Sequence, residues 1–432
     1  MEFYKILLPV GLIMLISKLL GIGLKRIGLP QVIGMLIAGV VVGLINYIPN
    51  QIILDDSVLE GISFIAKIGV VLIMFSAGIE TDLKQIKSTG IASIAITVMG
   101  VVLPMGLGFV VAAAFNGGFS DMTQENVLHN LFYGVILTAT SVSVTVATLK
   151  EIGKLNSKVG AAIVSAAIID DIIGIIILSF VLGLSETSGG SFTDFASSPY
   201  MVIVKTFAFF VFALIIALAI RYVFKWMDKK WPHNRRLPIF SFAFCFIFAF
   251  VSEEVFGVAD ITGAFLAGLM LSNIHSREYI ESKIDINCYM LFAPVFFASI
   301  GISTDFSAID SSMLAFGLVL IATGMFAKLA GCAFGAKICG MSNRDSYRIG
   351  LGMMARAEVA LVCAQKGVEA GIIESTIMPF ILILIMLTSF LTPLLLRLSY
   401  KKELGHDMPP LGTTMGEMFN DPNIKSGQTE IR

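Results

Sequence analysis

Two adjacent aspartates, Asp170 and Asp171, stand in the run SAAIIDDIIGIIIL, which is otherwise almost entirely apolar. One Asp at the centre of a membrane helix costs about 2.5–3.5 kcal/mol on insertion scales, so two in succession indicate a function. Such carboxylates can hold either protons or a desolvated cation. Because consecutive helix residues point about 100° apart, one carboxylate can face a basic partner while the other faces a cavity. A bridge that only stabilises the fold is the alternative.

Basic residues in other apolar runs are candidate partners for this pair. Lys328, in GMFAKLAGCAFG, is the deepest of them, whereas Lys18, Lys67 and Lys205 lie nearer to span ends and can snorkel to the interface. Arg356 and Glu358, in MMARAEVAL, form a further intramembrane pair of charges.

Two of the apolar runs are predicted to be interrupted helices. TATSVSVT, residues 138–145, is rich in hydroxyl and β-branched residues, which are mediocre helix formers. About 217 residues further on, GLGMMARAEV carries Gly350 and Gly352, which favour irregular backbone. Interrupted spans in matching positions indicate a transport site, because unwound carbonyls and half-helix ends can coordinate ions. Hydroxyls that bond back within continuous helices are the alternative.

The elements that carry these residues are predicted to be membrane helices. Hydrophobic residues make up 56% of the chain and charged residues 14%, with a mean hydropathy of +0.88, whereas soluble domains have about 25% charged residues. We therefore expect an all-α polytopic membrane protein with about thirteen transmembrane helices. Their expected ranges are 4–24, 30–48, 61–79, 89–115, 128–149, 156–183, 199–225, 237–256, 258–274, 286–303, 311–338, 345–367 and 372–397.

The charges of the loops alternate along the whole chain. Basic residues gather at 25–26, 84–87, 150–158, 221–236, 277–283, 337–348 and 397–402, and acidic residues occupy the loops between them. Because loops rich in Lys and Arg stay cytoplasmic, the N-terminus is predicted to be outside and the C-terminus cytoplasmic, in a multi-pass protein of the cell membrane.

Two motifs recur at an offset of about 225 residues. GMLIAG, residues 34–39, matches GAFLAG, residues 263–268, and SAGIETDL, residues 76–83, matches SIGISTDF, residues 299–306. By the loop charges, Asp82 is cytoplasmic and Asp305 is outside, so the two copies are inverted. Inverted-topology repeats are a recurrent plan of secondary transporters, which favours a carrier over a channel or an enzyme.

The order TATSVSVTVATL, IIDDIIG, a lone intramembrane lysine and RAEVALV resembles the cation:proton antiporters of the NapA-type branch, relatives of the sodium/proton exchangers. The resemblance covers about 400 residues. It implies a fold of the NhaA/NapA type, in which two discontinuous helices cross beside the aspartates, and a homodimer with an elevator-type motion of a six-helix core. It also implies these roles: Asp171 as the carboxylate that binds cation and proton, Asp170 as its neighbour paired with Lys328, Thr140 and Ser141 at the first crossing, and Arg356 and Glu358 at the second. Ala357 departs from the Gly that many relatives have.

The implied division has five parts. These are residues 1–60 and 185–285 for the dimerisation domain and linker helix, 61–184 and 286–400 for the two halves of the core transport domain, and 401–432 for a mobile cytoplasmic tail. The expected activity is exchange of Na⁺, or else K⁺ or Li⁺, for protons, with the lipid bilayer and a second copy as partners. No cofactor, nucleic acid or enzymatic activity is expected. The alternatives are a sodium-coupled symporter of an organic solute and a ligand-gated cation efflux system.

Overall fold

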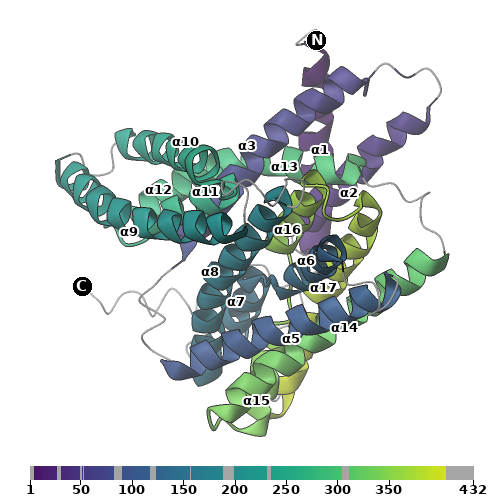
Figure 1. Ribbon diagram of the computed structural model, residues 1–432, viewed down its shortest axis with the longest axis vertical. Coiled ribbons are helices and arrows are strands. Elements are labelled where there is room, and N and C mark those ends of the chain that lie inside the picture. Colours follow the sequence, from purple (N-terminus) through teal and green to yellow (C-terminus); the bar gives the residue numbers. More distant parts are fainter. Residues whose placement is uncertain are drawn as a thin grey trace, which may run out of the picture.

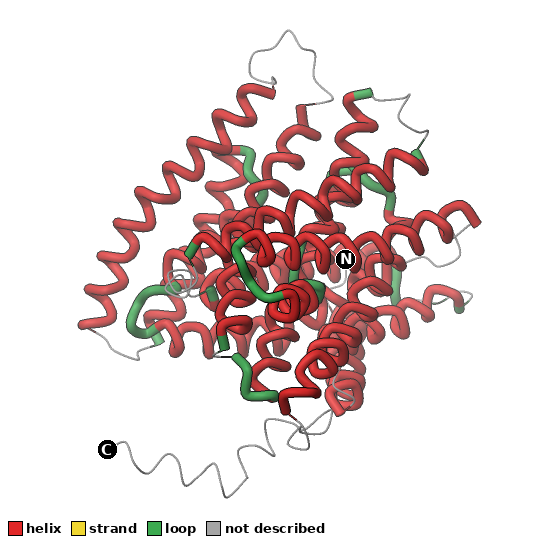
Figure 2. The backbone as a smooth tube through the Cα atoms, turned by 90° about the horizontal axis from the view of Figure 1, so that it is seen from below, coloured by secondary structure: helices red, strands yellow, loops and turns green. Residues whose placement is uncertain are grey.

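The computed structural model describes residues 4–26, 31–48, 51, 53–81, 90–116, 123–155, 157–187, 199–230, 235–303 and 311–404. Throughout these residues the regular elements are helices joined by loops and turns (Figure 2). The tail beyond residue 404 and both Asp82 and Asp305 of the repeated motifs lie outside the described residues.

In the described part of the chain, nine helical segments are long and apolar enough to cross a membrane. They are α1 (Tyr4–Arg26), α3 (Asp56–Glu80), α5 (Ile91–Phe115), α8 (Lys158–Thr187), α9 (Pro199–Lys230), α10 (Arg236–Phe256), the continuous segment from α12 (Arg277–Asn287) through the π-helical η3 (Cys288–Phe292) to α13 (Ala293–Ser303), α14 (Ser311–Ile338) and α17 (Met378–Leu404). The chain is therefore an all-helical, multi-pass membrane protein, as its composition predicts.

The remaining apolar segments are shorter or interrupted. The short helices are α2 (Gln31–Gly43), which continues into the 3₁₀ turn η1 (Leu44–Tyr47), and α11 (Asp260–Leu271). The interrupted segments are α6 (Gln124–Thr138) with α7 (Val142–Glu151), and α15 (Asn343–Gly352) with α16 (Glu358–Glu369), which the 3₁₀ turn η4 (Ser375–Ile377) separates from α17. Both interruptions fall in the runs where residue type predicts them.

The segment predicted at 286–303 begins earlier in the structure, at Arg277. Its first turns, REYIESKIDIN, are too polar for hydropathy to mark, although Ile280 and Ile284 are buried. The helix widens to a π-helical turn at Cys288–Phe292, just before Pro294. A proline ring clashes with the carbonyl four residues earlier, here that of Met290, and a π-turn removes the clash without ending the helix.

α3 begins at a well-defined N-cap outside its apolar stretch. The Asp55 carboxylate accepts hydrogen bonds from the Val58 N–H and the Ser57 hydroxyl, both at 2.8 Å. The bond from Ser57, followed by that from Val58, lowers the pKa of the Asp55 carboxyl below its usual value. This end of the helix therefore keeps a negative charge, which favours the helix N-terminus.

The repeated motifs pack on each other crosswise. Gly39 of GMLIAG lies directly against the backbone of Ala298 in α13, and Gly301 of SIGIS lies against Leu36 of α2. In the same way, Gly268 of GAFLAG lies against Phe75 in α3, and Gly78 of SAGIE lies against Phe265 in α11. The first motif of each copy thus packs on the second motif of the other copy. A Cβ at any of these glycines would collide with backbone atoms.

α5 and α14 form a second long pair and run side by side (Figure 1). Gly331 and Gly335 of α14 lie against backbone atoms of Met99 and Ala95 in α5, so the two helices approach closely. α5 also packs on α6 and α8, and α14 also packs on α15 and α17. These helices carry the two aspartates and Lys328, while α3, α11 and α16 supply the apolar side of the candidate site.

Candidate functional site

The two aspartates lie on α8, and Asp170 is paired with Lys328 of α14. The Lys328 ammonium donates to Asp170 Oδ1 at 2.8 Å and to Oδ2 at 2.9 Å. It donates a third bond to the Thr138 carbonyl at 2.7 Å, which satisfies its three donors. Lys328 is fully buried and Asp170 is 3% exposed. This is the pairing that the sequence predicts.

The two helix interruptions meet beside this ion pair. Between α6 and α7, the Ser141 N–H donates to the Ala355 carbonyl at 2.8 Å, which lies in the gap between α15 and α16. The Thr145 hydroxyl of α7 donates to the Gly352 carbonyl, the last residue of α15, at 2.6 Å. Helix ends leave backbone groups without intrahelical partners, and here each interruption supplies partners for the other.

Arg356 fills the second interruption and is fully buried. Its guanidinium donates to the Ala139 carbonyl and, at 2.8 Å, to the Gly324 carbonyl of α14. Lys328 and Arg356 therefore bind consecutive carbonyls, those of Thr138 and Ala139, at the C-terminal end of α6. Positive charge is favourable there because the helix dipole is negative at that end.

The backbone around Arg356 is also held by α17. The Arg356 N–H donates to the Thr388 hydroxyl at 3.2 Å, and the Ser389 hydroxyl donates to the Arg356 carbonyl at 3.0 Å. Glu358 is the first residue of α16, but its side chain lies outside the described residues, so its predicted part in the site stays a prediction.

Asp170 and Asp171 line one small cavity of about 10 Å³. From the first interruption, Thr138 and Ala139 also line it, while Thr140 and Ser141 are buried one and two residues further along. A cavity of this size has room for about one water molecule, and hence for one small ion in its place. The structure thus brings the predicted acidic pair to a space in which a single species fits.

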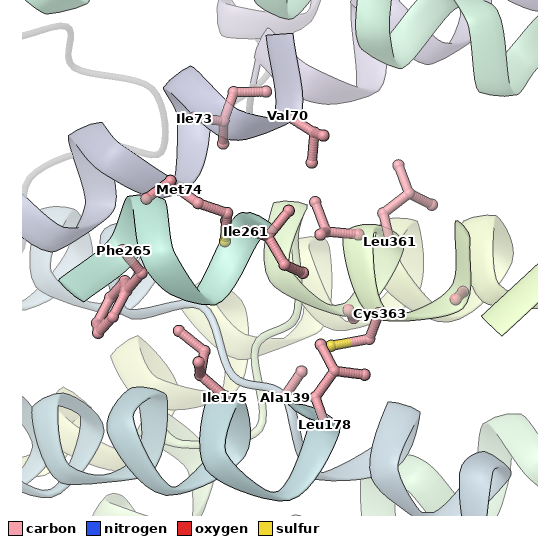
Figure 3. Close-up of a cluster of buried hydrophobic side chains, with 14 of the residues drawn as sticks. Val70, Ile73, Met74, Ala139, Ile175, Leu178, Ile261, Phe265, Leu361 and Cys363 are labelled. Atoms are coloured by element: carbon pink, nitrogen blue, oxygen red, sulfur yellow. The ribbon is translucent and has the colours of Figure 1, made fainter. Parts of the chain in front are cut away.

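An apolar cluster surrounds the cavity on the sides of α3, α11 and α16 (Figure 3). Met74 of α3, Ile261 of α11 and Cys363 of α16 line the cavity itself. Val70 and Ile73 continue the cluster along α3, and Ile175 and Leu178 lie on α8, one and two turns beyond Asp171. The carboxylates therefore face a mostly apolar wall, which limits the access of bulk water to them.

Sequence reasoning did not find every polar group of the site. The carbonyls of Thr138, Ala139 and Gly324 are the partners of the buried cations, and backbone carbonyls carry no signal of side-chain type. A separate acidic group, Glu80, Glu281 and Asp285, brings its carboxylate oxygens within 4.8 Å of one another at the far end of α3. It joins residues about 200 positions apart, so only the folded chain reveals it.

Comparison with known proteins agrees with this geometry. Residues 11–398 match the family described as "Sodium/hydrogen exchanger, transmembrane". The chain belongs to this family. Among curated members, it is 34% identical over 405 residues to the Na⁺/H⁺-K⁺ antiporter GerN of Bacillus cereus, covering 93% of this chain and 97% of that protein. It is 30% identical over 380 residues to a Na⁺/H⁺ antiporter of Enterococcus hirae, covering 88% of this chain and 94% of that protein.

The fold of this exchanger has a counterpart among solved structures. The sodium proton antiporter MjNhaP1 of Methanocaldococcus jannaschii superimposes with a TM-score of 0.72 at 17% identity, covering 96% of this chain and all of that one. Its membership of the sodium/hydrogen exchanger family makes it a transporter rather than an enzyme, and its activity is exchange of a monovalent cation for protons.

Proposed function

We propose that this exchanger carries Na⁺, with K⁺ or Li⁺ as alternatives, and that Asp171 and Asp170 bind cation and protons in turn. The observation that carries the proposal is the shared cavity of the two carboxylates at the meeting point of the helix interruptions. The relatives' names support the choice of ion, since one is called a Na⁺/H⁺-K⁺ antiporter and another a Na⁺/H⁺ antiporter.

In this mechanism Asp171 is the exchanging carboxylate. Asp170 is neutralised by Lys328 in the state described here, so it contributes little negative charge to the cavity. A cation that enters the cavity displaces protons from the acidic pair, and protons arriving from the opposite face displace the cation. Thr140 and Ser141 would orient the first interruption, and Arg356 with Glu358 the second.

We propose that the exchanger alternates between faces by a movement of one helix group against the other. The moving core would contain α5, α6, α7, α8, α14, α15, α16 and α17, which pack mainly on one another. The packing of α3 on α11 and of α13 on α2 supports placing α3 and α13 with the scaffold. The core then begins near residue 90 and near residue 311, rather than at 61 and 286.

The architecture proposed from the sequence has thirteen membrane segments in two inverted copies. The nine long segments, the two short helices and the two interrupted pairs support this count. The crosswise packing of the repeated glycine motifs supports the inversion. We place the N-terminus outside and the C-terminus in the cytoplasm, and propose a homodimer in the cell membrane, which chemical cross-linking in native membranes tests.

The central test is Asp171→Asn in proteoliposomes that contain a pH-sensitive dye. The wild-type chain should move protons when Na⁺, K⁺ or Li⁺ is added, and the variant should lose this response while its folded yield is kept. Glu254→Gln, an exposed carboxylate at the end of α10, is the matched control and should exchange normally. Undiminished exchange by Asp171→Asn would refute the assignment.

A symporter of an organic solute is less well supported. Such a carrier needs a binding site that can enclose its solute, whereas the aspartate cavity has a volume of about 10 Å³. A small inorganic ion fits this space, which supports exchange of a monovalent cation.

A further inference from the structure

Two further cavities lead from the beginning of α3 toward the aspartate cavity. The first, of about 580 Å³, is lined by Asp56, Glu60, Ser63 and Lys67 among others. The second, of about 30 Å³, shares Ser63 and Lys67 with the first and shares Val362 with the aspartate cavity. The three cavities thus lie one after another along α3, in the order that a stepped cation route from the beginning of this helix would have. It starts on the face that the loop charges predict to be external.

Lys366 of α16 lines the narrow second cavity. Its ammonium lies 2.8 Å from Asp260 Oδ1 and 3.8 Å from Glu369 Oε2. The lysine side chain is 17% exposed, so the pair is only partly shielded from water. Asp260 is the first residue of α11, which packs on α3, whereas α16 packs on α6 and α17. The ion pair therefore joins the two helix groups beside the route.

We propose that Lys366 is the gating residue of the external cation route and that Asp260 sets how strongly the Lys366 charge repels a cation. This inference rests on the function proposed above. A lysine in this narrow part of the route repels an approaching cation, because the repulsion between like charges grows as water is excluded. Asp260 and Glu369 offset this charge. The same ion pair ties α16 to α11 and has to separate when the two helix groups move apart.

The two partners of the ion pair should have opposite effects on cation affinity. Lys366→Gln removes the repelling charge, so the apparent KM for cation added at the external face should fall by roughly three- to tenfold. Asp260→Asn leaves the ammonium without its main partner, so the same KM should rise by a similar factor. The KM for cation added at the other face should change by less than about twofold, because that route does not pass Lys366.

The experiment measures KM and kcat for Na⁺ from each face of oriented proteoliposomes. Lys366→Arg keeps the charge and should keep the wild-type KM. Lys337→Gln removes an exposed lysine at the end of α14 and serves as the matched control. A lysine that only stabilised the fold would lower kcat or the folded yield in both Lys366→Gln and Asp260→Asn, without opposite shifts in KM.

A cysteine pair tests the gate independently of affinity. Lys366→Cys with Asp260→Cys should form a disulfide that stops exchange, and a reductant should restore it. The gate is overturned if Lys366→Gln and Asp260→Asn shift KM in the same direction, if both faces respond equally, or if exchange continues through the disulfide-linked protein. Undiminished exchange by the Asp171→Asn variant would instead overturn the proposed function, so the two failures are distinct.

Discussion

At the scale of single residues, the site is built around two buried basic side chains and the carbonyl oxygens that accept their hydrogen bonds. Lys328 is shared between Asp170 and the Thr138 carbonyl, and Arg356 between the carbonyls of Ala139 and Gly324. Each cation therefore links α6 to α14, and Lys328 also links both to α8. Removing Lys328 leaves the buried Asp170 carboxylate without its basic partner, which costs more than the bond itself contributes.

Lys328→Met tests this reasoning at the ion pair. The substitution leaves Asp170 buried and unpaired, and breaking a buried pair in this way costs about 3–5 kcal/mol. We expect a markedly lower melting temperature in detergent, while Na⁺ still protects the remaining folded protein against heat. The double variant Lys328→Met, Asp170→Asn should recover part of the loss, because no charge is then left unpaired.

The control for this prediction is Lys205→Met, which removes an exposed lysine of α9 and should leave the melting temperature nearly unchanged. A Lys328→Met protein as stable as the wild type would show that Asp170 finds another partner. A double variant less stable than either single variant would contradict the charge argument.

At the scale of helices, the interruptions depend on each other. α6 and α15 each end at residues whose carbonyls bind groups from the opposite interruption or from a buried cation. Two broken helices that were not in contact would leave these carbonyls unsatisfied in the lipid interior, where each costs several kcal/mol. The contact between α7 and the end of α15 is therefore part of what makes the breaks possible.

Thr145→Val tests that contact. Valine has nearly the same shape as threonine but lacks the hydroxyl that donates to the Gly352 carbonyl at 2.6 Å. We expect a loss of about 1–3 kcal/mol in stability, since the carbonyl is left buried without this donor. Thr148→Val is a matched control on the same helix, because the Thr148 hydroxyl donates only to the Val144 carbonyl of its own helix. Thermal unfolding of the two variants in the same detergent should rank Thr145→Val clearly below Thr148→Val.

At the scale of the whole molecule, the two copies of the motif pair hold the scaffold together. α2 packs on α13 and α3 packs on α11 through glycines that allow backbone contact. In lipid, where apolar burial gives little net attraction between helices, such close packing is a principal source of stability. The same arrangement brings the beginning of α3 and the end of α13 together at the cavity of about 580 Å³, which Asp56 and Ser303 line.

Cys339 reports the orientation of the whole molecule. It is exposed in the turn between α14 and α15, whereas Cys245, Cys288, Cys332 and Cys363 are buried. The loop charges predict that this turn is cytoplasmic. A membrane-impermeant maleimide should therefore label the wild-type chain in inside-out vesicles and fail to label it in intact cells. Cys339→Ser should abolish the labelling, and labelling of intact cells would reverse the proposed orientation.

Residue types and their order along the chain were enough to find the class of protein, most of the helices and the acidic pair. Lipid requires long apolar helices, so hydropathy and length are sufficient to find them. Both helix interruptions lie in the runs expected to contain them, but Gly350 and Gly352 themselves belong to α15, and the second break follows them at residues 353–357. Its depth in an apolar run indicated Lys328 as a basic partner, the family resemblance implied that Asp170 pairs with it, and the two side chains lie in contact in the structure.

The remaining groups of the site are visible only in the folded chain. The carbonyls of Thr138, Ala139 and Gly324, the packing of α3 with α11, and the contact of Lys366 with Asp260 join segments far apart in the chain. Apolar helices resemble one another in hydropathy, and every residue has the same carbonyl. Neither property specifies a partner, so these contacts depend on how the helices pack.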